Sequence, residues 1–199
     1  MRSDQQAIKI IESSGGIIHT TSAMKKGIHP RTLYSLRDTG RVATVSRGIF
    51  RLADLPELSQ PDIATVAARV PRAVICLVSA LSFHNLTTQR SSSISIAIAS
   101  SARSPRIDFP PLSVFRFSEK SLSAGVEEHL FDGITVRIFS PEKTIADCFK
   151  FRNKIGPDIF AEALKLYRMR RRFDVDALLK YAQVCRVERL MIPYLEAYL

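Results

Sequence analysis

The chain of 199 residues is 46% hydrophobic and has a mean hydropathy of +0.03, which predicts a soluble globular protein of one or two domains. The longest apolar run, residues 73–83, is too short and contains too much serine to cross a bilayer. The formal net charge of +10 at pH 7 favours a polyanionic partner, although charge alone does not identify it.

Three scattered cysteines, Cys76, Cys148 and Cys185, form neither a Cys-x-x-Cys pair nor a Cys/His ligand set. We therefore expect no zinc and no disulfide framework, but buried unreactive thiols, without any metal or cofactor. The first residues form an amphipathic pattern with charges rather than a secretory signal, so we expect a cytoplasmic protein without a membrane partner.

The chain begins with a predicted helix over residues 4–13, which has Ile8 and Ile11 on its inward face. Gly15-Gly16 ends this helix. Ile17-Ile18 then either lead into the next helix or pair with a later hairpin.

A helix–glycine–helix pattern follows. Hydroxyl groups at Thr20, Thr21 and Ser22 are suited to cap a short helix over about 22–26. Gly27 ends that helix, because a left-handed backbone carries no Cβ penalty at glycine.

A second helix starts after Ile28 with Pro30 in its first turn, where the missing N–H costs nothing, and it ends at Gly40. Leu33 and Leu36, three residues apart, point inward, so the polar residues between them face outward. A short helix with Arg, Thr and Ser on its outer side is suited to a DNA major groove.

Residues 41–52 predict a basic two-stranded hairpin, with Val42, Val45 and Phe50 as strand formers and Ser46-Arg47-Gly48 at the tip. The order of helix, glycine turn, helix and hairpin is that of a winged helix-turn-helix. The alternative is a small basic helical bundle whose hairpin binds a protein or nothing.

We predict that the exposed polar residues of this segment contact DNA. Arg31, Thr32 and Ser35 would meet base edges, while His29 is either a phosphate or base contact or a simple turn residue. The full predicted set is Lys25, Lys26, His29, Arg31, Thr32, Tyr34, Ser35, Arg37, Arg41 and Arg47.

A proline-containing polar segment, residues 53–61, marks a boundary between residues 1–54 and residues 55–199. Beyond it we predict a helix over 62–70 and a buried apolar segment that favours a helix ending near His84. Strands are then predicted at 91–99, 112–117, 126–131 and 134–139, with a hairpin turn at Asp132-Gly133.

Four helices complete the chain, over about 142–151, 156–169, 174–184 and 187–199, the last either kinked by Pro193 or starting late. The predicted fold class is α+β: an N-terminal winged helix-turn-helix and a C-terminal domain with a small, mostly antiparallel sheet and a helical bundle.

No constellation of residues predicts catalysis. No Gly-x-Ser-x-Gly turn occurs, and Ser79, Ser82 and His84 are wrongly spaced on a helix to act together. A nuclease would need an acidic-x-Lys triplet on a strand, and none is present. We therefore expect no enzymatic activity and no catalytic residue.

The segment Ser140-Pro141-Glu142 is a helix start, and Lys143 and Thr144 behind it would suit a phosphate. The favoured interpretation is structural, with Thr144 and Asp147 bracing the helix against the sheet. The basic run 168–172 is expected to be solvated, with a second nucleic-acid or protein contact as the alternative.

Two stretches together resemble AbiEi-type antitoxins of bacterial abortive-infection toxin–antitoxin systems. One is GGIIHTTSAMKKGIHPRTLYSLRDTGRVATVSRGIFRL, residues 15–52. The other, looser one includes VSALSFHNL at 78–86, SISIAIA at 93–99 and FDGITVRIFSPEKTIADCF at 131–149, where SPEKTIAD is similar to a helix start of that family.

The resemblance implies a DNA-binding N-terminal domain that represses its own operon. It also implies a C-terminal domain that counteracts a nucleotidyltransferase-type toxin without forming a stable complex with it. The expected partners are duplex DNA carrying an operator, typically inverted repeats bound by a homodimer, and such a toxin. Two other classes stay open: a protein-interaction module with an acidic partner, and an RNA-binding regulator.

Overall fold

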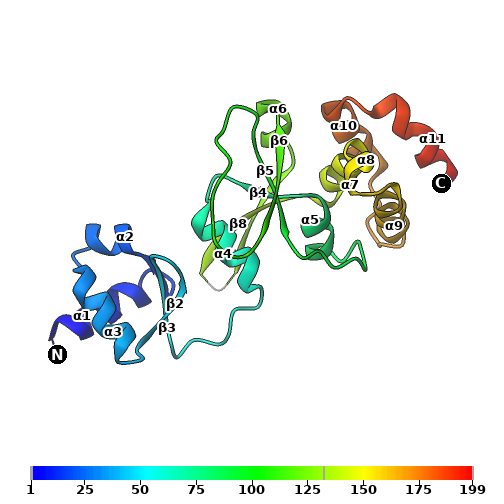
Figure 1. Ribbon diagram of the computed structural model, residues 1–199. Helices are drawn as coiled ribbons and strands as arrows, with labels where there is room; N and C mark the ends of the chain where they lie inside the picture. Colours follow the sequence, from blue (N-terminus) through cyan, green and yellow to red (C-terminus); the bar gives the residue numbers. More distant parts are fainter. Residues whose placement is uncertain (1, 132, 199) are drawn as a thin grey trace. The chain divides into compact units, whose positions relative to one another are not determined.

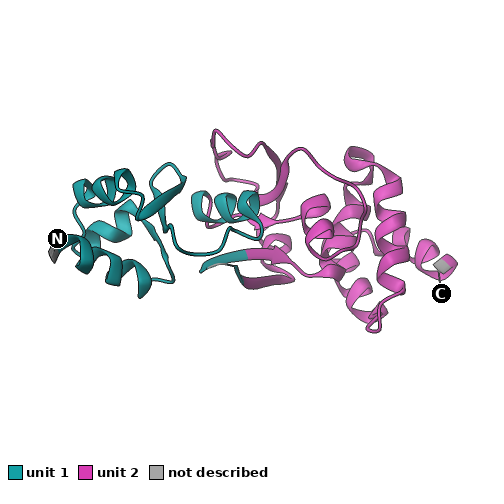
Figure 2. Ribbon diagram, turned by 90° about the horizontal axis from the view of Figure 1, so that it is seen from below, with its two compact units in different colours: residues 1–69, 130–136 teal, residues 70–129, 137–199 magenta. Residues whose placement is uncertain are grey.

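The computed structural model describes residues 2–131 and 133–198. The chain divides into two compact units (Figure 2). Unit 1 comprises Met1–Arg69 and Leu130–Val136, and unit 2 comprises Val70–His129 and Arg137–Leu199. The first unit thus extends beyond residue 54, where the sequence predicts the domain boundary. The division into separate domains at residue 54 stays a prediction.

Unit 1 combines helices with a small antiparallel sheet (Figure 1). Its elements are α1 (Arg2–Glu12), β1 (Ile17–His19), α2 (Thr20–Lys25), α3 (Pro30–Asp38), β2 (Val42–Ser46), β3 (Ile49–Leu52) and α4 (Pro61–Arg69). The strand order is β1-β3-β2, and Ile18 lies opposite Phe50. Ile17-Ile18 meet both expectations, since they pair with the hairpin and the strand that they belong to runs directly into α2.

The main core of unit 1 is built from inward residues of α1, α2 and α3 and from residues of the three strands. Ile11 of α1, Leu33 of α3 and Phe50 of β3 are all nearly inaccessible to solvent. Their spacing follows the helical and strand periods seen in the sequence, which is why these elements were predictable. Burial of such side chains stabilises the unit by about 1.5–3 kcal/mol each.

The start of α2 corrects one expectation. The helix begins at Thr20 with His19 as its N-cap residue, and no side chain makes a capping hydrogen bond. The Thr20 hydroxyl instead donates to the Gly48 carbonyl oxygen at 3.2 Å. Because β1 runs directly into α2, the first threonine lies beside the hairpin turn rather than over its own helix end. Gly27, at a φ of +86°, ends the turn after α2 as predicted.

Unit 2 contains most of a five-stranded sheet and seven helices of the described chain. Its strands are β4 (Val74–Ile75), β5 (Ile94–Ala99), β6 (Leu112–Phe117), β7 (Val126–Phe131) and β8 (Ile134–Phe139). Its helices are α5 (Leu77–Phe83), α6 (Glu119–Ser123), α7 (Pro141–Lys150), α8 (Arg152–Ile155), α9 (Pro157–Arg168), α10 (Val175–Cys185) and α11 (Glu188–Tyr198). Residues 130–136 at the turn between β7 and β8 are assigned to unit 1.

The sheet is mixed, so the expectation of a mostly antiparallel sheet is wrong. The strand order is β6-β5-β4-β8-β7; β5 pairs with β6 in parallel and β4 with β8 in parallel, whereas β4 and β5 are antiparallel. Parallel neighbours need a crossover connection. The loop over residues 100–111 provides one, since it carries the chain back to the starting end of β5 before β6 begins.

Most predicted elements of unit 2 are confirmed in type and place, including the strands at 112–117 and 134–139 and the helix capped by Ser140. Helices α6 and α8 and the two-residue strand β4 were not predicted, because four- and five-residue helices and two-residue strands carry no periodicity. Helix α11 contains Pro193, so the late start is not found. The predicted turn at Asp132-Gly133 lies partly outside the described residues.

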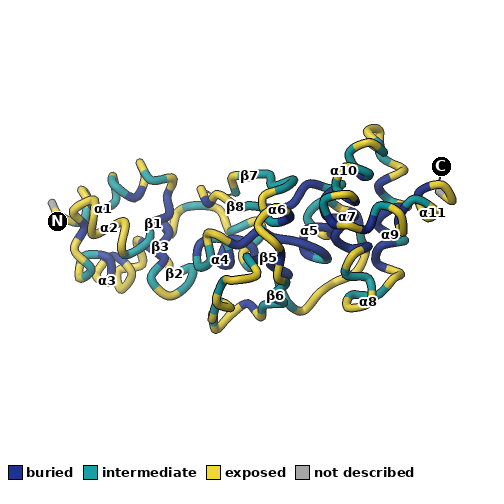
Figure 3. The backbone as a smooth tube through the Cα atoms, turned by 90° about the horizontal axis from the view of Figure 1, so that it is seen from above, coloured by how far each residue is buried: buried dark blue, intermediate teal, exposed yellow. Residues whose placement is uncertain are grey.

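Helix α7 is the centre of unit 2, packed against α5, α9 and α10, and it is buried over most of its length (Figure 3). Inside it, Lys143 Nζ lies 2.5 Å from Asp147 Oδ2, and both side chains are 0% exposed. The ammonium also lies 4.2 Å from the centre of the Phe139 ring. Cys185 Sγ donates to Asp147 Oδ1 at 3.0 Å, so the carboxylate is satisfied on both oxygens.

The structural interpretation of SPEKTIAD is therefore confirmed for Thr144 but wrong for Asp147, whose partners are Lys143 of the same helix and Cys185 of α10 rather than the sheet. The phosphate alternative is wrong because Lys143 is paired and inaccessible. Thr144 braces the helix as expected, since its hydroxyl donates to the Phe139 carbonyl of β8 at 3.1 Å. All three thiols are buried, and burial raises the pKa of Cys76, Cys148 and Cys185. Among the described residues, no helix has the length and hydropathy that a membrane span requires.

The buried ion pair gives a stability prediction. Asp147→Asn leaves the Lys143 ammonium buried without a counter-charge, so we expect the free energy of unfolding to fall by about 3–5 kcal/mol. The double variant Lys143→Met with Asp147→Leu removes both charges and should cost less than the single change. Urea unfolding followed by circular dichroism checks this, and a double variant less stable than Asp147→Asn would contradict it.

A histidine at the end of α5 gives a pH prediction. His84 Nε2 lies 2.8 Å from the Phe139 carbonyl oxygen, which fits a neutral ring donating from Nε2. Burial lowers the pKa of His84, only partly offset by that hydrogen bond. A depressed folded-state pKa means that the unfolded chain binds the proton first as the pH falls below about 6.5. Stability should therefore be full above that pH and decline below it.

The measurement is urea unfolding at pH 7.5 and pH 5.5 for the wild type and for His84→Gln, which retains an N–H donor without titrating. We expect a smaller loss of stability at pH 5.5 in the variant. Equal losses in both proteins would show that His84 does not contribute to the pH dependence.

Candidate nucleic-acid interface

Helix α3 separates its residues cleanly into two sides. Leu33 and Leu36 are 0% and 2% exposed and pack into the core of unit 1. At about 100° per residue, Arg31, Tyr34 and Ser35 fall on the opposite side. All three are exposed. The outer side of α3 thus presents a guanidinium and a hydroxyl, two groups that read base edges in a major groove.

His29 caps this helix. Its ring Nδ1 accepts a hydrogen bond from the backbone N–H of Arg31 at 3.1 Å, and Pro30 occupies the first helical turn. In the neutral ring the proton is then on Nε2, on an exposed side chain. The two possibilities in the sequence, turn residue and ligand contact, are therefore compatible, since one ring nitrogen caps the helix while the other is a free donor for an anion.

Tyr34 connects the outer side of α3 to the hairpin. Its ring meets that of Phe50 edge-on, with 5.9 Å between the ring centres. The guanidinium carbon of Arg37 lies over the Tyr34 ring, 5.1 Å from its centre. The same guanidinium donates two hydrogen bonds to Asp38 Oδ1, at 2.7 and 2.9 Å. The pair offsets the negative charge that Asp38 would otherwise present at the end of the helix.

Two other predicted contact residues lie towards the side of α1. The hydroxyl of Thr32 lies 3.5 Å from that of Ser3, and Lys26 Nζ donates to the Ser14 hydroxyl at 2.6 Å. These are single hydrogen bonds at the surface, between side chains that are exposed (Ser3, Lys26) or half-buried (Thr32, Ser14), and such bonds exchange readily with water or phosphate. Lys25, the last residue of α2, is exposed.

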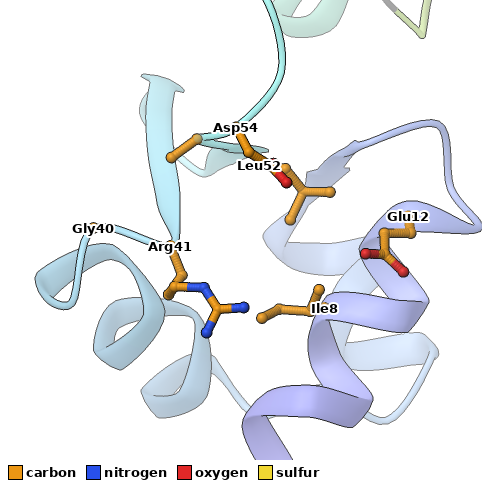
Figure 4. Close-up of a pocket in the computed structure, with 7 residues that line it drawn as sticks. Ile8, Glu12, Gly40, Arg41, Leu52 and Asp54 are labelled. Carbon is orange, nitrogen blue, oxygen red and sulfur yellow. The ribbon is translucent and has the colours of Figure 1, made fainter.

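Arg41 differs from the others, because it lines a small pocket of about 170 Å³ (Figure 4). The close-up shows its guanidinium directed towards Ile8 of α1, with Glu12 and Asp54 at the same pocket. Its side chain therefore lies across the junction between α1 and the start of β2. A phosphate contact by Arg41 would require the side chain to turn out of this pocket.

Arg47 is exposed at the tip of the β2–β3 hairpin. The two carbonyl groups of the tip, those of Arg47 and Gly48, both accept hydrogen bonds from outside the hairpin. Gly48 O accepts from the backbone N–H of Thr20 at 2.9 Å, and Arg47 O accepts from Arg69 Nη1 of α4 at 2.7 Å. The sequence does not predict this contact of Arg69, because the residues next to Arg69 in the chain give no sign of a partner in the hairpin.

The first 54 residues carry nine Lys and Arg residues against four Asp and Glu residues, so half of the net charge of +10 lies in about a quarter of the chain. Such a density attracts phosphates over a distance of about 10 Å at 0.1 M salt. One of the nine, Arg51, is 8% exposed and donates instead to the carbonyl groups of Leu55 and Pro56, which holds the following segment against the sheet.

Two further features of the sequence, Ser79 and the basic run 168–172, lie in unit 2. Ser79 is 7% exposed and its hydroxyl accepts from the backbone N–H of Ser95 at 2.8 Å, so it is not available as a nucleophile. In the basic run, Arg170 donates to the His84 carbonyl oxygen, whereas Arg171 and Arg172 are exposed. The described part of the chain has no group of three or more potential metal ligands.

The cap at His29 gives a prediction. His29→Ala removes the acceptor for the Arg31 N–H, so the free energy of unfolding should fall by about 1 kcal/mol. His29→Asn keeps a side-chain acceptor at the N-cap and should remain close to the wild type. Thermal unfolding followed by circular dichroism compares the three proteins. Equal destabilisation in both variants would show that the cap does not stabilise α3.

No curated protein matches the chain in sequence. The crystal structure of the RV2827C protein from Mycobacterium tuberculosis superposes with a TM-score of 0.54 at 11% identity, over 87% of this chain and 70% of that one, which shows a shared fold alone. Residues 5–53 match the family described as "Transcriptional regulator, AbiEi antitoxin", so the resemblance of this part of the chain to AbiEi-type antitoxin regulators is confirmed.

Proposed function

We propose that this protein is a winged helix-turn-helix transcriptional regulator of AbiEi antitoxin type. Helices α2 and α3 with the turn at Gly27 form the helix-turn-helix, and the β2–β3 hairpin is the wing. The observation that carries the proposal is the exposed side of α3, with Arg31, Tyr34 and Ser35 beside a hairpin that has Arg47 at its tip. The family match over residues 5–53 covers all of these residues.

In the proposed complex, α3 enters the major groove of duplex DNA. Arg31 would donate to a guanine edge, and Ser35 and Thr32 would bond to bases of either kind. Tyr34 lies near the sugar-phosphate backbone, and the free Nε2 of His29 donates to a phosphate at the helix N-terminus. Phosphates would be neutralised by the cations around the helix: Lys25, Lys26, Arg37, Arg41 and Arg47.

The proposal extends to the biological setting implied by the family. The operator would be an inverted repeat bound by two copies of the chain, through which the protein represses its own operon. The part beyond residue 54 would counteract a nucleotidyltransferase-type toxin without a stable complex. Co-expression of this chain with such a toxin tests the antitoxin role. Restored growth without co-purification of the two proteins supports that role, whereas unrestored growth contradicts it.

DNA binding itself is tested by a fluorescence anisotropy titration with the duplex upstream of its own gene. Low salt gives the phosphate attraction its full strength, so absence of binding there would reject the proposal. Competitor tRNA distinguishes the RNA-binding alternative. Because A-form RNA hides base edges in a deep, narrow major groove, tRNA should compete poorly for a major-groove reader.

Arg31 and Lys25 should differ in what they contribute. Arg31→Ala should weaken operator binding by about 1–3 kcal/mol and relax sequence preference at one position. Lys25→Ala and Lys26→Ala should each weaken all duplexes alike and reduce the salt slope by about one unit. Lys180→Ala, which removes an exposed cation of α10, serves as the control for loss of charge. Equal effects of Arg31→Ala on operator and random DNA would contradict base reading.

A further inference from the structure

The tip of the β2–β3 hairpin, Arg47-Gly48, is not fixed by the hairpin itself. The pairing of β2 with β3 shifts register between Thr44 and Ser46, next to the tip. A two-stranded hairpin is marginally stable alone, and an irregular pair weakens the regular ladder further. The position of Arg47 therefore depends on the contacts that the tip makes with other elements.

Those contacts come from two sides. The Gly48 carbonyl oxygen accepts from Thr20, both from its backbone N–H at 2.9 Å and from its hydroxyl at 3.2 Å. The Arg47 carbonyl oxygen accepts from Arg69 Nη1 at 2.7 Å. The first contact is made within the segment that matches the regulator family, whereas Arg69 lies beyond residue 53, where that match ends.

Arg69 is held on a firm support. It is the last residue of α4, whose inward residues Ile63, Ala64 and Val66 are at most 7% exposed. A cation at a helix C-terminus is also favoured by the helix dipole. Burial lowers the pKa of His19 in β1, and the positive charge of Arg69 lowers it further. The guanidinium thus stands at the junction of α4, β1 and the hairpin.

We propose that Arg69 is a positioning residue for the DNA-binding hairpin, and that α4 is part of the DNA-reading unit although it lies outside the family-matched segment. This role rests on the proposed function: Arg69 acts through Arg47 and makes no contact of its own with DNA. The hydrogen bond fixes the peptide group at Arg47, so that the Arg47 side chain starts from one place when it meets a phosphate. Pre-organisation of this kind reduces the ordering cost of binding.

The hydrogen bond can be tested without DNA, by amide hydrogen exchange of the full chain. Arg69→Met removes the donors and the charge but keeps an aliphatic chain of similar shape. We expect the amides of residues 44–49 to exchange roughly tenfold faster in this variant, as expected for loss of a hydrogen bond to a charged group. Arg72→Ala is the control, because it removes an exposed arginine three residues further along the chain and should leave hairpin exchange unchanged.

The action through Arg47 is tested by the salt dependence of duplex binding in a double-mutant cycle. Arg47→Ala should reduce the salt slope by about one unit, and Arg69→Met should reduce it by a similar amount. If Arg69 acts through Arg47, the double variant loses about one unit rather than two. A protein that is only destabilised would show a lower melting temperature with an unchanged slope.

The possible outcomes are distinct. A loss of two units in the double variant would show that Arg69 contacts a phosphate itself, which overturns the positioning role. Unchanged hairpin exchange in Arg69→Met would overturn the proposal whatever the DNA results. If the wild type binds no duplex DNA, the proposed function fails, and the assignment of α4 to a DNA-reading unit fails with it. The exchange data would still decide separately whether Arg69 holds the hairpin.

Discussion

The antiparallel pairing of β1 with β3 is the interaction on which the arrangement of unit 1 depends. Only three residues of β1 pair, with Ile18 opposite Phe50, yet this joins the N-terminal helix to the hairpin. Because β1 leads straight into α2, the same pairing places Thr20 at the hairpin tip. Helix α3 then packs between α1 and the hairpin, and its outer side faces solvent with its polar residues.

This arrangement explains why the outer side of α3 is polar and why its first turn has a defined position. The apolar residues Leu33 and Leu36 of α3 are buried in the core, and the hydrogen bond to His29 caps the first turn of this helix. The cations around the helix are not equivalent. Arg31, Lys25 and Arg47 are exposed. Arg37 and Arg41 are exposed too, but Arg37 is paired with Asp38 and the Arg41 guanidinium is directed into a pocket. In the proposed complex, charge density would bring DNA close, and the exposed side of α3 would read the bases.

Unit 2 is organised around a buried pair of opposite charges rather than around a site. Lys143 and Asp147 lie one helical turn apart in α7, and Cys185 of α10 completes the hydrogen bonds of the carboxylate. Such a pair contributes little net stability compared with apolar residues of similar volume, but loss of one member leaves an uncompensated buried charge. In SPEKTIAD, the Thr144 hydroxyl ties α7 to β8 and the Asp147 carboxylate ties it to α10, which gives the segment a physical role in holding α7 in place.

The sequence by itself determined the elements with a clear period or end signal. Leu33 and Leu36 marked the inner side of α3, and Pro30 and Gly40 marked its ends. The apolar alternation before Ser100 marked a strand. These signals are readable because local sterics and burial act over a few residues. Only the tertiary structure decided the pairing of β1, the parallel strands of the sheet, the burial of Lys143 and the hydrogen bond of Arg69 to the hairpin. These depend on residues far apart in the chain, and no local pattern records which distant partner a carbonyl or an ammonium group will meet.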